Sequence, residues 1–191
     1  MARPLSVSDD EILNVANGVF QTRGPDHFSL SEVAREVGLS RAAIILRFNS
    51  ANDLKHLVMM DRAERFEALL AAVEIKRGAE GLLAIAGLIG SKAGSRSGNA
   101  NFMSRMSANI ADPVVRELEE RRGESLRAAV RRAMPPTVIS EEEAVDAFMA
   151  HLSGSLLQWQ LSEQGDGSSF LRERTLSWLR LAGMTGKVVH K

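Results

Sequence analysis

Cysteine and tyrosine are both absent from this sequence of 191 residues. Without cysteine the chain can form neither a disulfide nor a thiolate metal site, and the absence fits the cytoplasm. Long apolar runs are missing too. No apolar run, residues 82–86 included, is long enough to span a bilayer, and the first residues lack the apolar core of a signal peptide. We therefore expect a cytoplasmic protein that does not enter a membrane.

Neither sign of charge prevails, because 24 Lys and Arg residues balance 24 Asp and Glu residues. Domains that bind nucleic acid are usually basic, yet residues 1–58 carry six cationic and seven anionic side chains. DNA binding by this region therefore requires that the two signs lie on different faces. Arg41, Arg47 and Lys55 would line the DNA side, and Arg3 would lie on an N-terminal arm.

Residues suited to catalysis or metal binding are sparse. The four histidines, His27, His56, His151 and His190, share no spacing typical of metal ligands. His151 lies in an apolar-rich segment, where it is either a hydrogen-bonded core residue or a polar group in a pocket. No glycine-rich phosphate loop, nucleophile elbow or paired carboxylate cluster is present. The sequence thus predicts no metal, no cofactor and no enzymatic activity.

Apolar residues recur at helical spacing along the chain, and no segment alternates as a strand would. The pattern predicts an all-α fold. A first helix runs from residue 9 to about 21, and a long helix begins near Ser50 after two short ones. Further helices are expected at 79–90, 102–110, 113–134, from Ser140 onward and from Ser168 to 183. We divide the chain into an N-terminal domain, residues 1–50, and a larger helical domain, residues 51–191.

Two short helices joined by a tight turn are expected in residues 28–48. Ser29 and Glu32 have the spacing of a capping box, which begins the first helix. Gly38 stands where a left-handed residue ends a helix, and Ser40 can cap the next one. This layout is typical of a helix-turn-helix, whose second helix enters the DNA major groove.

The second of these helices has an apolar and an outward face. Ile44, Ile45 and Phe48 are expected to face inward, which leaves small residues and two arginines to approach bases and phosphates. The candidate DNA contacts of the whole region are Arg3, Ser29, Ser31, Ser40, Arg41, Ala42, Ala43, Arg47 and Lys55. The competing interpretation is a structural corner in a helical protein-interaction module, which the near-neutral charge supports.

The N-terminal region resembles the TetR family of transcriptional regulators. The resemblance rests on the segments EILNVANGVFQTRG and SLSEVAREVGLSRAAIILRF. Several residues are of the type that the family has at the same positions: Phe20, Gly24, Val33, Ala34, Gly38, Ser40, Ile44 and Phe48. Ile45, Arg47 and Ala51 depart from the tyrosine, histidine and lysine that the family often has there. Backbone N–H groups at helix starts would then supply more of the phosphate contacts.

The resemblance implies a ligand-responsive regulator, most simply a repressor. A small molecule bound by residues 51–191 would release a homodimer from a palindromic operator, and the helices from Ser140 and Ser168 would form the dimer interface. Few polar anchors are visible, which favours a bulky, largely apolar ligand. DDEILNVA, VAREVGLSRAA and LLQW are similar to macrolide-sensing repressors, so the ligand is expected to be macrolide-like or another drug. The candidate ligand contacts, each equally consistent with ordinary core, are Phe66, Phe102, Met103, Met106, Ile110, Met149, Leu152, Ser153, Leu156 and Trp159.

Overall fold

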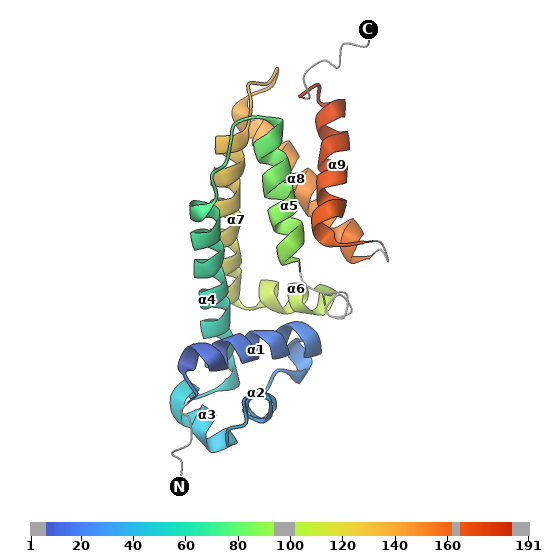
Figure 1. The fold of residues 1–191 in the computed structure, drawn as a ribbon. Helices are drawn as coiled ribbons and strands as arrows, with labels where there is room; N and C mark the ends of the chain where they lie inside the picture. Colours follow the sequence, from blue (N-terminus) through green and yellow to red (C-terminus); the bar gives the residue numbers. More distant parts are fainter. Residues whose placement is uncertain (1–6, 94–101, 162–164, 185–191) are drawn as a thin grey trace. The chain divides into compact units, whose positions relative to one another are not determined.

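A computed structural model describes residues 7–93, 102–161 and 165–184, and all regular structure in these ranges is helical (Figure 1). The prediction of an all-α fold is therefore confirmed. None of the described helices is long and apolar enough to cross a membrane. In chain order the elements are α1 (Asp9–Arg23), the 3₁₀ turn η1 (Pro25–His27), α2 (Leu30–Val37), α3 (Arg41–Phe48), α4 (Ala51–Ala72), α5 (Ala79–Lys92), α6 (Phe102–Ala111), α7 (Pro113–Ala133), α8 (Glu141–Gln160) and α9 (Gly167–Leu181).

The chain forms two compact units. Unit 1 consists of Met1–Glu67 with Arg96–Arg122, and unit 2 consists of Ala68–Ser95 with Gly123–Lys191. The long helices α4 and α7 each contribute residues to both units. Compactness thus places α6 with the N-terminal helices. The predicted domain boundary at residue 50 divides the chain by function and not by compactness, and it stays a prediction.

The N-terminal helices of unit 1 surround a small apolar core. Ser8 begins α1 through a capping box with Glu11, in which each side chain accepts a hydrogen bond from the other residue's backbone N–H. The apolar stripe of α1 then packs on the inward faces of α2, α3 and α4. The buried members of this core are Ile12, Ala16, Val19, Leu30, Val33, Ala34, Ile44, Phe48, Leu54 and Val58. We call α1, η1, α2 and α3 the head.

A second cluster in unit 1 joins the head to α4 and α7. Phe20, Met59 and Val115 are buried together, and the ring of Phe20 meets the ring of Phe28 edge-on with centroids 5.6 Å apart. Because Val115 lies in the first turn of α7, this cluster fixes the start of that helix against α4.

Unit 2 is held together by close helix packing. The apolar helix α5 packs along α9, and α8 also contacts α9. Gly90 on α5 and Gly167 on α9 lie so close that a Cβ on Gly90 would meet the Gly167 carbonyl oxygen at 2.1 Å. Leu82, Leu171 and Leu179 are almost completely buried there. The glycines of the Ala79–Gly90 segment therefore allow helix contact, even though glycine weakens an isolated helix.

Candidate DNA-binding site

The turn between α2 and α3 has the geometry of a helix-turn-helix. Ser29 caps α2, its Oγ accepting a hydrogen bond from the Glu32 N–H at 3.2 Å. Gly38 ends α2 with φ of 77° in the left-handed region, and its N–H is bonded to carbonyl groups of the last turn. Ser40 then starts α3, its Oγ accepting from the Ala43 N–H at 3.1 Å. The caps fix the direction in which α3 leaves the turn.

One face of α3 is buried and the opposite face is open. Ile44 and Phe48 pack into the core of the head. Ala42 is exposed, and Leu46 keeps 86% of its surface exposed. Sequence reasoning missed Leu46, although at 3.6 residues per turn it lies opposite Ile44 and Phe48. Ala42, Ala43 and Leu46 are here called the outward face of α3.

The two arginines of α3 have different surroundings. Arg41 occupies the first position of the helix, is exposed, and forms no ion pair with another described residue. Arg47, in the last turn, donates from Nη1 to the Val7 carbonyl oxygen at 2.7 Å and lies 3.4 Å from an oxygen of Asp9. The guanidinium group of Arg47 is therefore directed toward the start of α1. Base contact by either arginine stays a prediction.

The three serines predicted to contact DNA also have different surroundings. The hydroxyl oxygens of Ser29 and Ser40 accept backbone N–H groups as helix caps, while Ser31 is exposed on α2. A capping hydroxyl can still donate its own proton to a phosphate. Arg3 and the side chain of Phe102 lie outside the described residues.

Lys55 is directed into unit 1 instead of toward solvent. Its Nζ pairs with an Asp112 carboxylate oxygen, and His56 Nε2 lies 3.0 Å from the same oxygen. The side chains of Lys55 and Asp112 are mostly buried. Burial raises the pKa of Asp112, but hydrogen bonds from Lys55, His56 and the Val115 N–H outweigh it, so this pKa lies below its usual range. Asp112 also caps α7, accepting from the Val114 N–H at 3.1 Å.

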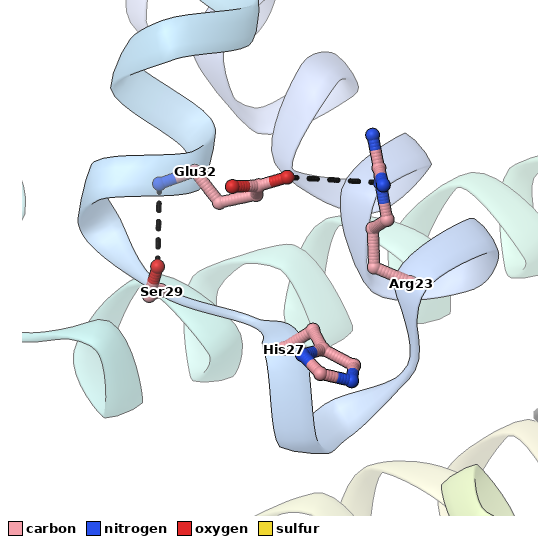
Figure 2. A pocket seen from close by; sticks show the side chains of 4 residues that line it. All are labelled: Arg23, His27, Ser29 and Glu32. Atoms are coloured by element: carbon pink, nitrogen blue, oxygen red, sulfur yellow. Dashed lines mark hydrogen bonds and ion pairs between the residues drawn. The ribbon is translucent and has the colours of Figure 1, made fainter.

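A shallow hollow of about 380 Å³ lies on the head beside the start of α2 (Figure 2). It is lined by Arg23, His27, Ser29 and Glu32. Arg23 Nε lies 3.6 Å from a Glu32 oxygen, which links the end of α1 to α2. The lining is polar and the hollow is open, whereas pockets for drug-sized ligands are mostly apolar and enclosed. This hollow does not have the properties expected of the effector site.

Helix α6 contacts the head directly. Arg105 Nη1 donates to the Gln21 carbonyl oxygen at 2.8 Å, and α6 also packs against η1. On α4, Arg62 Nη1 donates to Asn17 Oδ1 at 3.3 Å. Burial lowers the pKa of Arg62 to about 10, and Arg122 and Arg105 add like-charge repulsion. The C-terminal half of α1 is therefore bonded to both α4 and α6.

The predicted effector contacts are distributed over both units. Phe66 is buried in unit 1 with the Arg122 guanidinium 4.8 Å from its ring centroid. Leu152 and Trp159 on α8 are buried in unit 2, Met149 and Leu156 are half-buried, and Ser153 is exposed. Met103, Met106 and Ile110 are exposed along α6. The effector site stays a prediction.

Groups suited to metal chemistry are not assembled in the part of the chain that the structure describes. No cluster of three or more His, Asp or Glu side chains there could hold a metal ion. His151 Nε2 lies 3.2 Å from Thr175 Oγ1, and its ring stacks on Trp178 with centroids 5.4 Å apart. His151 is half-buried, and both interpretations of this residue stay open.

Residues 12–56 match the family model described as bacterial regulatory proteins, tetR family. The matched range contains the capped helices, the Gly38 turn and the open face of α3. The head is a TetR-type helix-turn-helix domain. No curated protein matches the chain.

Solved structures extend the TetR-type likeness over both units. A TetR transcriptional regulator from Legionella pneumophila is 17% identical, with a TM-score of 0.67, covering 94% of this chain and 100% of that one. A transcriptional regulator from Saccharomonospora viridis in complex with choline is 18% identical, with a TM-score of 0.69 and coverages of 88% and 93%. FadR from Bacillus subtilis in complex with stearoyl-CoA is 14% identical, with a TM-score of 0.66 and coverages of 94% and 100%. At these identities the likeness shows the fold alone.

Proposed function

We propose that this protein is a repressor that binds a palindromic DNA operator as a homodimer and is released by a small molecule. The open face of α3 carries the proposal. Helix α3 is capped at its start by Ser40, and at its end the Asn49 N–H donates to the Ile45 carbonyl oxygen. Its outward face is exposed to solvent and does not pack within the head. A rigid exposed helix of this kind fits the major groove.

A dimer would supply the second head that a palindrome requires. In a twofold dimer, two α3 helices about 34 Å apart would address successive major grooves on one side of the duplex. The helices α8 and α9, which begin after Ser140 and Asp166, are the proposed interface. Exposed leucines on these helices or directly after them support this assignment: Leu157, Leu161 and Leu181.

The effector is proposed to be largely apolar. The row Met103, Met106 and Ile110 leaves a flexible apolar surface on α6 open to a ligand. The solved relatives named above hold stearoyl-CoA and choline, which are too different to indicate one ligand class for this chain. The macrolide-like ligand suggested by the sequence stays a prediction.

Release would act through α6. Because Arg105 is bonded to the Gln21 carbonyl oxygen, a shift of α6 displaces the end of α1 and with it the head. An effector changes DNA affinity only if it binds the two arrangements with different affinity. Effector and operator would then weaken each other's binding by the same factor.

The test is titration of a palindromic operator, obtained by selection from random duplexes, over a range of salt concentrations. We expect a clearly negative slope of log affinity against log salt, because phosphate contacts release counterions. Arg41→Ala should weaken binding by roughly 1–3 kcal/mol if it contacts a base. Arg116→Ala, an exposed arginine on α7, is the matched control and should bind like the parent.

The alternative function is a helical protein-interaction module whose α2–α3 corner is purely structural. The excess of acidic side chains in residues 1–58 favours it. A salt slope near zero, with unchanged binding by Arg41→Ala, would select the module over the repressor.

A further inference from the structure

The inference rests on the proposed function and concerns what α3 recognises. Leu46 is the residue that the fold leaves unexplained. It is 86% exposed on a short helix whose other large apolar side chains are buried or half-buried. Single exposed leucines are common on protein surfaces. Leu46, however, stands at the centre of the face that the helix-turn-helix presents to DNA.

Hydrogen-bond donors are missing from the outward face of α3. Ala42, Ala43 and Leu46 offer only methyl groups. Arg47, the cation nearest to this face along the helix, is bonded to the Val7 carbonyl oxygen. Arg41 lies at the N-terminal end of α3, one turn before the centre. The middle of the helix therefore cannot use the bidentate hydrogen bonds by which arginine reads guanine or asparagine reads adenine.

The major groove offers one apolar group on its base edges, the C5-methyl of thymine. We propose that Leu46 packs against a thymine C5-methyl group, so that the centre of each operator half-site is recognised by methyl contact instead of hydrogen bonding. Leu46 is thus a specificity-determining residue, and the ligand of the α3 face is a duplex with thymine at that position.

The spacing along α3 extends this contact to neighbouring base pairs. Ala42 and Leu46 are four residues apart on the same side of the helix, about 6 Å along its axis. Base pairs are stacked at about 3.4 Å, so one turn covers between one and two base-pair steps. The small Ala42 side chain lets the helix backbone come close to the groove, while Leu46 projects further. The two positions together select a short A·T-rich centre.

The experiment removes the thymine C5-methyl group from the DNA and leaves the rest of the base unchanged. The full-length protein first selects its operator from random duplexes, and each thymine of that operator is then replaced by deoxyuridine, which keeps every hydrogen-bonding group. We expect about a fourfold loss of affinity for each contacted methyl, the factor that corresponds to about 0.8 kcal/mol per buried CH₂. The sensitive positions should be related by the operator's symmetry.

Leu46→Ala tests whether this residue makes the contact. Because Leu46 is exposed, the variant should fold normally, bind the thymine operator more weakly, and no longer distinguish it from the deoxyuridine operator. Val138→Ala, at a fully exposed apolar residue in the loop before α8, is the control and should keep the parent's discrimination.

Two outcomes overturn the inference alone. One is salt-dependent operator binding with no deoxyuridine-sensitive position, and the other is an undiminished deoxyuridine penalty in Leu46→Ala. If the protein binds no duplex in a salt-dependent way, the proposed function is wrong, and the inference fails with it.

Discussion

Arg47 in the last turn of α3 donates a hydrogen bond to the carbonyl oxygen of Val7, 40 residues earlier in the chain, at 2.7 Å. The same guanidinium lies 3.4 Å from Asp9 in the first turn of α1. The contact connects the end of the proposed recognition helix to the start of the head. This contact also engages an arginine that the sequence alone predicts to bind DNA.

We expect Arg47→Ala to lower the free energy of unfolding by about 1 kcal/mol, the usual net value of one such hydrogen bond. If the bond to Val7 makes Arg47 a residue that orients α3, the loss of operator affinity should be similar for all single-base operator variants. Urea unfolding and binding to an operator-variant panel measure the two effects. Arg35→Ala, an exposed arginine paired with Glu32 on α2, is the control and should change stability little. Relaxed specificity at one base pair would show that Arg47 reads it.

Asp112 should make stability sensitive to strong acid. Its pKa is lower in the folded protein than the ordinary value of about 3.9. The charged carboxylate therefore stabilises the fold above pH 4, and this contribution is lost as the pH falls toward the folded pKa. Asp112→Asn keeps a capping side chain for α7 but removes the charge. We expect the variant to be less stable at pH 7 and to lose less stability than the parent between pH 4 and pH 2, measured by thermal unfolding. Parallel curves would contradict this.

His151 should add a second pH dependence nearer neutrality. Burial lowers the pKa of His151, so the folded state binds this proton less readily than the unfolded chain does. The stabilising contribution is thus complete above about pH 6.5 and declines as the pH falls through the folded pKa. His151→Gln retains a group that can bond to Thr175 without titrating. Denaturant unfolding at pH 7.5 and pH 5.5 should show a smaller difference for the variant, and an equal difference would refute the assignment.

Gly90 tests the close packing of α5 on α9. A methyl group there would meet the Gly167 carbonyl oxygen at 2.1 Å, which requires the helices to separate. Gly90→Ala should therefore destabilise unit 2 by a few kcal/mol, as overpacking does. Gly154→Ala is the matched control, because a Cβ at this helical position on α8 meets nothing within 4 Å. It should be neutral or stabilising by up to about 1 kcal/mol, because alanine is the better helix former. Equal melting temperatures for the two variants would contradict the packing argument.

Local rules in the sequence were sufficient to determine the helices. Ser29, Gly38 and Ser40 act on backbone groups within a few residues of themselves, and the structure shows both serine caps and the left-handed turn. The capping box expected of Ser29 and Glu32 is only half formed, because the Glu32 carboxylate pairs with Arg23 and Arg35. The cap of α1 is also local, since Ser8 and Glu11 are three residues apart, and the same rule would have located it. The helix-turn-helix followed from these signals together with the apolar stripes, and its TetR type was implied by the family resemblance of the same segments.

Only the tertiary structure decided which side chains remain available for DNA. Lys55 meets Asp112 and Arg47 meets Val7 across 57 and 40 residues of sequence, and no local pattern pairs them. Long cationic side chains take whatever acceptor the folded chain brings near, because burying part of a charge without a partner is costly. The proposed role of Leu46 depends on the same packing, since the bond of its neighbour Arg47 to Val7 leaves only methyl groups at the centre of the outward face of α3. The sequence determined that a helix would be presented, and the packing around it determined its chemistry.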